Sequence, residues 1–337
     1  MIVTQAADEA SVQAMVADAK IVLNVAGPFS QYHADNIVAA CARTGTHYAD
    51  LSGEYWYQRR MIDEFHQESE RTGARIVLAA GVDSIPSDLG VQFAIERLAE
   101  KGGRARQVKA LFTRYAGSFS GGTRRSMQAR KAIKQSIEYE AEFHADPYVL
   151  APGAEGQHDG ETVAGWDSRR FDSDLRRFGV PFFMAPINAR VVRRSLALDG
   201  HLPCTYEEGI SVAALLQATW LYLSRGFGYF VGAPIPMQPE SGEGPPPWLQ
   251  RAGSFRVRVH ATTEDRAKSA LVEVRGAGDP GYLATSKMLA EVGLASLLDE
   301  SPRRAGVLTP ATALGPVLRR RLAEVEEGRF MQFRALD

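Results

Sequence analysis

Three short stretches hold most of the residues that could do chemistry. They are Asn24–Phe29, Asp50–Glu54 and Gly81–Asp88. Together they offer carboxylates, hydroxyls, a carboxamide and glycines, the groups with which proteins bind and orient polar ligands. Gly27 permits close approach of the backbone to a ligand, and Pro28 stiffens the turn around it. The chemistry indicated is therefore the binding and positioning of a polar ligand.

Each stretch follows a short run rich in β-branched residues and precedes a helical pattern. The runs are Ile21–Val25, His47–Leu51 and Arg75–Ala79. Strands that alternate with helices of this length form right-handed βαβ crossovers and a parallel sheet. Ligands bind such sheets beyond the carboxyl ends of the strands. The sequence thus predicts an α/β fold with a Rossmann-type parallel sheet and the three stretches at one edge of it.

The third stretch has two interpretations. Asp83 and Ser84 stand at a predicted helix N-terminus, where free N–H groups attract anions, and could face a ligand. The alternative is local, because Ser84 or Ser87 can cap the helix and Asp88 favours its first turn. We assign Ser87 and Asp88 to capping and keep Asp83 and Ser84 as site residues.

A fourth stretch consists of Ser120, Gly121, Gly122 and Thr123, two glycines between hydroxyls at a predicted helix start. Such a loop can form a nest for a carboxylate or a phosphate. Alternatively it is a flexible helix entry with Thr123 as the cap. It is not a P-loop, because the Lys-Ser/Thr ending is absent. On the residues alone both interpretations stay open.

The rest of the chain predicts a second, α+β domain. The strand Gln107–Tyr115 should complete the first block, and Arg190–Arg194 should form a solvated helix face. The predicted units are residues 1–115, residues 116–305 and a C-terminal helix, residues 306–337, that returns to the first unit. The further elements predicted are a helical run to Phe143, a loop over much of Asp146–Asp174, helices Phe182–Leu198, Ile210–Arg225, Tyr282–Leu298 and Ala311–Glu327, a hairpin of Ser254–Thr262 and Ser269–Arg275, and a terminal strand Phe330–Arg334.

Composition excludes several classes of protein. The 337 residues carry a formal net charge of −1, which favours neither nucleic acid nor an acidic membrane surface. Cys41 and Cys204 lack metal-ligand spacing, and no two of the seven histidines stand four residues apart, so we expect no metal site. The N-terminus lacks a secretory-signal pattern, which predicts a cytoplasmic protein. The apolar run Ile210–Leu223 is too short to span a bilayer, although contact with lipid or an acyl chain stays an alternative.

Seven motifs then occur in a fixed order: Val25–Phe29, Asp50–Glu54, Asp83–Gly90, Ser120–Thr123, Ala185–Asn188, Gly281–Thr285 and Gly306–Ala311. In this order they resemble the saccharopine dehydrogenase-like oxidoreductases. More narrowly, they resemble the branch that includes the trans-acting enoyl reductases of actinobacterial lipid synthesis. The resemblance covers essentially the whole chain. It implies an oxidoreductase that uses NADP(H) rather than NAD(H) and reduces a C=C group of a lipid or polyketide-derived substrate.

The resemblance also implies roles for residues. The loop after the Ile21 strand would pass under the nicotinamide ribose, and the first helix entry would touch the adenine, although Asp8 can equally be a simple helix cap. The predicted cofactor-binding residues are Ala7, Asp8, Asn24, Gly27, Pro28, Phe29 and Asp83. The predicted catalytic residues, chosen on position alone, are Asp83, Ser84 and Thr123. The predicted substrate-facing residues are Tyr115, Ser120, Gly121, Gly122 and Thr123.

One departure from the family stands out. Family members open with a strand, a G-x-T-G-x-x-G loop and a helix that hold the dinucleotide pyrophosphate. This sequence has no such loop and starts at what resembles the third strand, so we expect an N-terminally truncated relative with exposed strand edges. The alternatives are a binding or scaffold protein that has lost the cofactor loop, and a dehydrogenase of an amino-acid-like substrate. The last of these predicts arginines that recognise a carboxylate.

Overall fold

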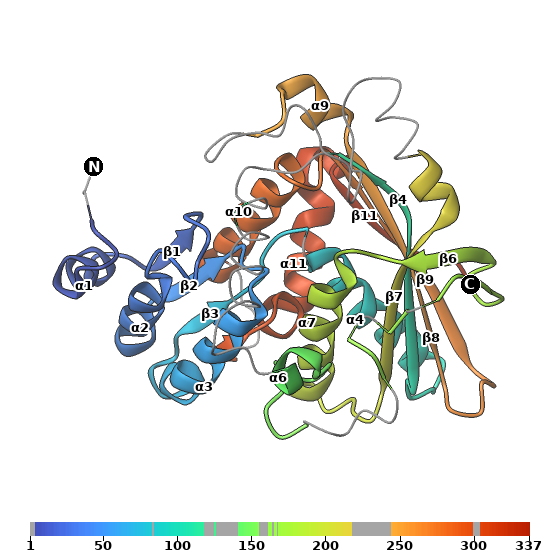
Figure 1. Ribbon diagram of the computed structural model, residues 1–337, viewed down its shortest axis with the longest axis horizontal. Coiled ribbons are helices and arrows are strands. Elements are labelled where there is room, and N and C mark those ends of the chain that lie inside the picture. Colours follow the sequence, from blue (N-terminus) through green and yellow to red (C-terminus); the bar gives the residue numbers. More distant parts are fainter. Residues whose placement is uncertain are drawn as a thin grey trace.

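The computed structural model describes residues 4–82, 84–117, 125, 141–154, 161–163, 165–166, 168–217, 244–298 and 304–337. Two sheets stand on either side of a layer of helices (Figure 1). The fold is mixed α/β with one parallel sheet, which confirms the predicted class. Within these described ranges no helix is long and apolar enough to cross a membrane.

The first sheet is parallel and has the order β1-β2-β3-β10. Its strands are β1 (Ile21–Asn24), β2 (His47–Asp50), β3 (Arg75–Val77) and β10 (Gly306–Leu308). Its helices are α1 (Glu9–Ala17), α2 (Ala34–Thr44) and α3 (Tyr55–Thr72). The three predicted strands lie parallel in one sheet as expected, and β1 is an edge strand in which Leu23 is 39% exposed. β10 is a correction: its three residues are too few to show strand periodicity, and we expected only a lead-in to a helix.

The second sheet has seven strands in the order β11-β9-β8-β4-β7-β6-β5. They are β4 (Gln107–Ala116), β5 (Arg170–Asp172), β6 (Arg177–Pro181), β7 (Thr205–Ser211), β8 (Ser254–Thr262), β9 (Ser269–Ala277) and β11 (Met331–Ala335). The β8–β9 hairpin and the terminal strand confirm two predictions. β4 is a correction, since it lies centrally in this sheet between β8 and β7 and does not complete the first block. A strand pattern in the sequence does not say which sheet the strand will join.

The apolar run that starts at Ile210 is also a correction. Ile210 and Ser211 end β7, where Ile210 pairs with Phe112 of β4 and Val180 of β6. Residues 212–217 are helical, and the rest of the predicted helix lies outside the described residues. An apolar run buried between strands on both sides has no alternation, so periodicity could not separate it from a buried helix.

The remaining helices are α4 (Ile85–Glu100), α6 (Ala141–Ala145), α7 (Ala185–Leu198), α9 (Pro247–Ala252), α10 (Leu283–Leu298) and α11 (Pro310–Gly328). Four of them, α4, α7, α10 and α11, fill the layer between the two sheets (Figure 1). The helices predicted around α7, α10 and α11 are thereby confirmed. The division into units 1–115, 116–305 and 306–337 stays a prediction; β10 joins the sheet of the first unit, whereas β4 of the first unit lies in the other sheet.

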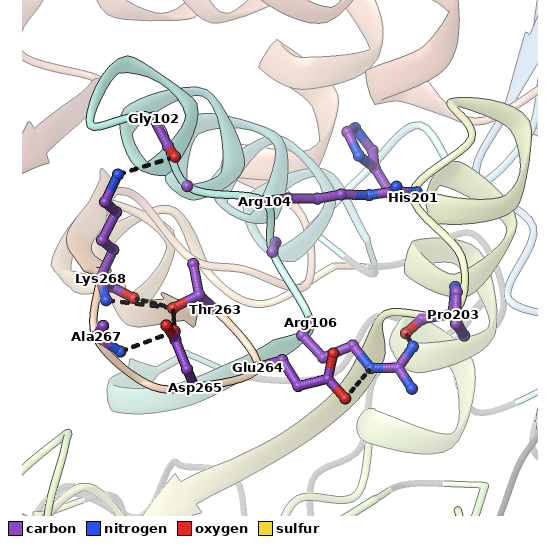
Figure 2. Close-up of a pocket in the computed structure, with 12 residues that line it drawn as sticks. Gly102, Arg104, Arg106, His201, Pro203, Thr263, Glu264, Asp265, Ala267 and Lys268 are labelled. Carbon is purple, nitrogen blue, oxygen red and sulfur yellow. Dashed lines mark hydrogen bonds and ion pairs between the residues drawn. The ribbon is translucent and has the colours of Figure 1, made fainter.

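A cavity of about 750 Å³ opens at the amino end of β4. Its walls come from the α4–β4 turn, the β8–β9 turn and the segment before β7 (Figure 2). Its charges are mixed: Lys268 donates to the Gly102 carbonyl at 3.0 Å, and Asp265 accepts from the Thr263 hydroxyl at 2.6 Å. The carboxyl ends of β1, β2 and β3 contribute nothing to this lining, so the cavity is not the predicted ligand site.

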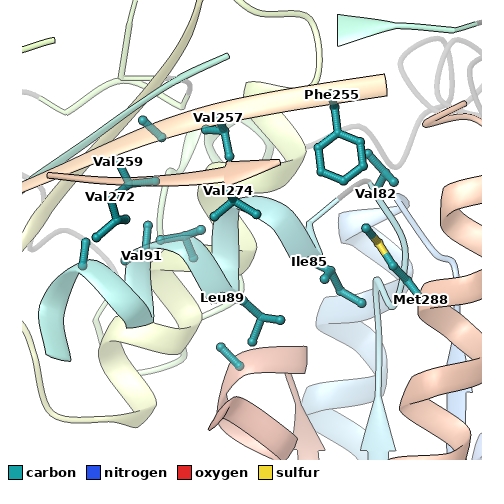
Figure 3. Packing of buried hydrophobic residues seen from close by; sticks show 14 of the residues in the cluster. Val82, Ile85, Leu89, Val91, Phe255, Val257, Val259, Val272, Val274 and Met288 are labelled. Carbon is teal, nitrogen blue, oxygen red and sulfur yellow. The ribbon is translucent and has the colours of Figure 1, made fainter. Parts of the chain in front are cut away.

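The main core joins α4 to the second sheet (Figure 3). Leu89 and Val91 of α4 belong to the same buried cluster as Val257, Val259 and Val274 of the β8–β9 hairpin. Gly90 makes this approach possible, because a Cβ there would lie 3.1 Å from Val274 Cγ2 and 3.2 Å from Val259 Cγ2. The start of α4, which carries the third polar stretch, is therefore fixed against the second sheet.

The arginines of α7 are buried, which corrects the predicted solvated face. Arg190, Arg193 and Arg194 are 1%, 0% and 4% exposed. They donate to backbone carbonyls: Arg190 to His144 at 2.6 Å, Arg193 to Tyr206 at 2.8 Å and Arg194 to Leu150 at 2.7 Å and to Val307. Burial lowers the pKa of Arg194 to about 9. A guanidinium with five donors satisfies carbonyls that irregular segments leave unpaired, and so these arginines hold the segments around α6 and β10 to α7.

Asp88 and Ser87 do not cap their own helix, which is a further correction. Asp88 accepts from the Ser195 hydroxyl of α7 at 2.5 Å and from the Ala311 amide of α11 at 2.8 Å. Ser87 donates to Glu208 of β7 at 2.6 Å. Side chains of this kind favour local caps in isolated helices. Here α4 is covered on several sides, and partners from other elements take both groups.

Asp88→Ala should lower the free energy of unfolding by about 2–4 kcal/mol, because the buried Ala311 amide and Ser195 hydroxyl lose their acceptor. Asp88→Asn can still accept from the Ala311 amide through Oδ1 and can donate to the Ser195 hydroxyl through Nδ2, so it should cost less. Urea unfolding measures both variants, with Asp63→Asn on the exposed face of α3 as the matched control. An Asp88→Ala protein as stable as the parent would contradict the role given to this carboxylate.

The same carboxyl group predicts a pH dependence. Burial raises the pKa of Asp88 to about 7, although hydrogen bonds from Ser195 and Ala311 oppose this shift. An Asp in the unfolded chain has a pKa of about 3.9. The folded state therefore holds a proton that the unfolded state loses, and this stabilisation is complete below about pH 4 and disappears as pH rises through 7. The parent should lose stability relative to Asp88→Asn between pH 5 and 8. If the free energy of unfolding changed with pH in the same way for both proteins, this prediction would be refuted.

Candidate active site

The three polar stretches meet at the carboxyl edge of the first sheet. β1, β2 and β3 are parallel neighbours, so the loops after Asn24, Asp50 and Val77 emerge on the same side. The Ala80 amide donates to the Asp50 carbonyl at 2.7 Å, which joins the second loop to the third. Sequence reasoning thus places these loops together correctly.

A buried hydrogen-bond chain fixes the ends of β1 and β2. The Asn24 amide donates to the Tyr48 hydroxyl at 3.1 Å, which donates to Asp50 at 3.1 Å, and Asp50 accepts from the Ser52 hydroxyl at 2.7 Å. Burial raises the pKa of Asp50 to about 6, although the two bonds from Ser52 oppose this shift. Asn24 also accepts from the Ala26 amide at 3.0 Å. The predicted cofactor residue Asn24 therefore shapes its loop from inside, with 7% of its surface exposed.

Glu54 anchors the first loop to the second. Its carboxylate accepts from the Phe29 amide at 2.9 Å and from the Ser30 amide and hydroxyl at 3.1 and 2.5 Å. Glu54 is 1% exposed, whereas Val25 at the tip of the first loop is 71% exposed. The stretch from Val25 to Gly27 is thus presented outward on a loop of fixed shape.

The third loop is held by α10. The Val82 amide donates to the Thr285 hydroxyl at 3.0 Å, and that hydroxyl donates to the Pro280 carbonyl at 2.8 Å. A Cβ on Gly81 would stand 3.0 Å from Thr285 Cγ2 and 3.1 Å from Leu51 Cδ2, so a larger residue would have to push these two side chains away. Thr285 belongs to the Gly281–Thr285 motif, whose sequence signalled a family feature without indicating this role.

Ser84 is the most unusual polar residue at this edge. It is the N-cap residue of α4 but makes no side-chain cap bond. The residue is 0% exposed, and its hydroxyl has no hydrogen-bond partner among the described residues. Buried polar groups in native proteins are nearly always paired, and exceptions concentrate at functional positions or where a bound group is not present. The Ser84 hydroxyl could therefore donate a hydrogen bond to a bound group beside the third loop.

The other predicted site residues are distributed differently. Asp8 caps α1, accepting from the Ala10 amide at 3.1 Å, and Ala7 beside it is exposed. Tyr115 is 7% exposed and packs edge-on against Phe112 and Phe182 in the core. Asp83, Ser120, Gly121, Gly122 and Thr123 lie outside the described residues. No group of metal-ligating side chains occurs in the part of the chain that the structure describes.

Comparisons with known proteins agree with this architecture. A family model described as the saccharopine dehydrogenase NADP binding domain matches residues 1–77. A Mycobacterium tuberculosis protein named as a candidate trans-acting enoyl reductase is 36% identical over 93% of this chain and 80% of its own. The trans-acting enoyl reductase of Mycobacterium ulcerans is 31% identical over 96% of this chain and 83% of its own. Saccharopine dehydrogenase (L-Glu forming) from Saccharomyces cerevisiae has a TM-score of 0.51 at 10% identity over 98% of this chain and 88% of its own, which shows the fold alone.

The parallel sheet, its carboxyl-edge loops and the matched domain define an NAD(P)-dependent oxidoreductase. The chain belongs to the saccharopine dehydrogenase-like family, in the branch of the trans-acting enoyl reductases. The family predicted from the seven motifs is confirmed, and the matched domain favours NADP(H) as expected.

Glu54→Ala should release the first loop, because the Phe29 and Ser30 amides lose their buried acceptor. Hydrogen exchange of these two amides should accelerate by about tenfold or more, the equivalent of roughly 1.4 kcal/mol of lost protection. Glu64→Ala, an exposed change on the same helix, is the matched control and should leave both amides protected. Unchanged exchange in Glu54→Ala would show that the loop is held by other contacts.

Proposed function

We propose that this oxidoreductase uses NADPH to reduce the C=C bond of a 2-enoyl thioester that a separate polypeptide presents. The names of the relatives support the enoyl group and the action in trans. The observation that carries the proposal is the buried, partnerless hydroxyl of Ser84 at the carboxyl edge of the sheet. We also infer a cytoplasmic location.

The described residues fit the nicotinamide half of the cofactor. Val25 is exposed, Gly27 carries no side chain, and Glu54 fixes the shape of their loop. A flat ring and its ribose need such an open backbone surface. The amides of Phe29 and Ser30 already bind Glu54, so this loop does not offer them to a phosphate. The fit therefore concerns the reacting end of the cofactor.

The chemistry requires one hydrogen-bond donor at the substrate. When bound, the nicotinamide would supply the hydride for the β-carbon; negative charge would develop on the thioester oxygen, and a proton from solvent would complete the α-carbon. Ser84 is suited to donate to that oxygen as its charge develops, because its hydroxyl has no competing acceptor. Burial strengthens such a bond and keeps water from the developing charge.

The arginines of α7 do not support the alternative of an amino-acid-like substrate. It requires arginines that are available to a carboxylate. The buried arginines of α7 instead bind backbone carbonyls at His144, Tyr206 and Leu150. No specific contact among the described residues favours that substrate class.

Fluorescence titration and an NADPH-oxidation assay test the function. NADPH should bind saturably and more tightly than NADH, and a 2-enoyl thioester should drive NADPH oxidation while the saturated acyl thioester does not. Absence of binding up to about 1 mM NADPH in a folded sample would refute the proposal for this polypeptide.

Ser84→Ala should separate catalysis from stability. Loss of one donor at a developing oxyanion lowers kcat by about 10²-fold, with the NADPH dissociation constant unchanged. Stability should stay equal or rise, because the variant removes a buried hydroxyl that has no partner. Ser87→Ala is the matched control on the same helix: Glu208 loses one donor, so stability should fall by about 1–2 kcal/mol with kcat within about threefold. If Ser84→Ala and Ser87→Ala lowered kcat equally, Ser84 would have no specific role in catalysis.

A further inference from the structure

The outer face of the second sheet carries a concentrated set of arginines. Side chains alternate between the two faces of a strand. Val257, Val259 and Val274 point inward to α4 (Figure 3), so their neighbours in β8 and β9 point outward. We call the outward set the arginine face, and it consists of Arg114, Arg256, Arg258, Arg275 and Arg334.

Strand register aligns these arginines in two rows. Arg275 of β9 pairs with Arg256 of β8, which pairs with Arg114 of β4. In the next row Arg334 of β11 pairs with Glu273 of β9, which pairs with Arg258 of β8. Four strands spaced by about 4.8 Å make this face roughly 15 Å wide.

A β-bulge places Arg114 on this face. The β4–β8 register shifts between Phe112 and Arg114, so Thr113 is the extra residue. Without the shift, alternation would turn Arg114 into the core and Tyr115 outward. The bulge thus adds a fifth arginine to the outer face and buries Tyr115.

The charge of this face is poorly compensated. Three of the five guanidinium groups, those of Arg256, Arg258 and Arg275, lie within 4.0 Å of the Glu273 carboxylate, which is 1% exposed and accepts from Arg258 at 3.1 Å and from Arg275. Burial would raise the pKa of Glu273, but these bonds outweigh it and hold the pKa below its usual value. Arg256 stands 3.9 Å from the same carboxylate, and Arg334 has no counter-ion among the described residues.

Burial and the neighbouring Arg256 charge also lower the pKa of Arg114, so the arginines repel one another. Further along the sheet, Asp172 and Asp174 are occupied by Lys109 at 2.8 and 3.0 Å. The chain as a whole has a net charge of −1, so this excess of positive charge is local. A local excess that the fold does not neutralise attracts an external anionic surface.

We propose that the arginine face docks a carboxylate-rich surface of the polypeptide that carries the enoyl thioester. The inference rests on the proposed function and names the partner's chemistry. Arginine suits this task because its planar fork binds carboxylates in pairs. From β9 the chain continues into α10, whose Thr285 holds Val82 beside Ser84. The start of β8 lies near this loop, because Phe255 and Val82 belong to one buried cluster (Figure 3).

A protein partner is favoured over a nucleic acid. A polyanion binds through many separated phosphate contacts and favours an overall positive protein. Here the positive charge is confined to two short rows and surrounds a fixed carboxylate, Glu273, which would repel a phosphate placed centrally. An acidic protein surface can place its carboxylates over the arginines and away from Glu273.

The test uses the full chain and a small acidic acyl carrier protein, labelled for fluorescence anisotropy. Arg256→Gln with Arg334→Gln removes two charges and leaves Glu273 its donors Arg258 and Arg275, so folding should be preserved. The dissociation constant should rise by about 5- to 10-fold, and the parent's binding should weaken steeply with salt. Arg71→Gln with Arg329→Gln, at positions 71% and 74% exposed, is the matched control and should bind as the parent does.

Two outcomes would overturn the proposal. Equal binding of the carrier protein by the parent and by the Arg256/Arg334 variant would show that docking uses another surface. Tighter binding of a duplex DNA, lost in the same variant, would assign the face to nucleic acid. NADPH titration and turnover of a short free enoyl thioester in the same samples keep a failed docking surface distinct from a failed reductase, because neither readout needs the arginine face.

Discussion

The buried carboxyl group of Asp88 connects the elements on which both sheets depend. It ties α4 to α7 through Ser195 and to the first turn of α11 through the Ala311 amide. α11 begins immediately after β10, the strand that returns to the first sheet, and α4 packs on the second. A low-dielectric interior makes such bonds strong when every group is satisfied and costly when one is not. The relative position of the two sheets therefore depends on a few polar atoms within an apolar layer.

The polar residues at the start of α4 have two different roles, one structural and one chemical. Ser87 and Asp88 bind partners in β7, α7 and α11, whereas the buried Ser84 hydroxyl has no partner among the residues that the structure describes. Gly90 lets α4 lie close against the valines of β8 and β9, and Ser84 at the start of the same helix is 0% exposed. A donor fixed in this way needs little reorganisation when charge develops near it, and this is the condition for effective electrostatic stabilisation.

Sequence patterns predicted the local elements well and their partners poorly. Strand-end loops, the hairpin of β8 and β9 and the family all followed from periodicity and motif order. The sheet joined by β4, the three-residue strand β10 and the change of role at Asp88 did not, because each is decided by residues distant in sequence. The prediction for the arginines of α7 was wrong for a related reason. A run of charged residues usually lies at the surface, but here the arginines are buried and donate to carbonyls at a helix end, His144, and in a turn, Leu150.

The alternation of β8 links the two surfaces that the proposed function needs. Val257 and Val259 hold α4 from one side, while Arg256 and Arg258 present charge on the other. A flat nicotinamide ring requires a small, fixed site, which the anchored strand-end loops provide. A macromolecular partner requires accessible charges, which the exposed Arg334 and the partly exposed Arg256, Arg258 and Arg275 provide. β8 therefore lies between the arginine face and the start of α4, and the packed core fixes how far apart these two surfaces are.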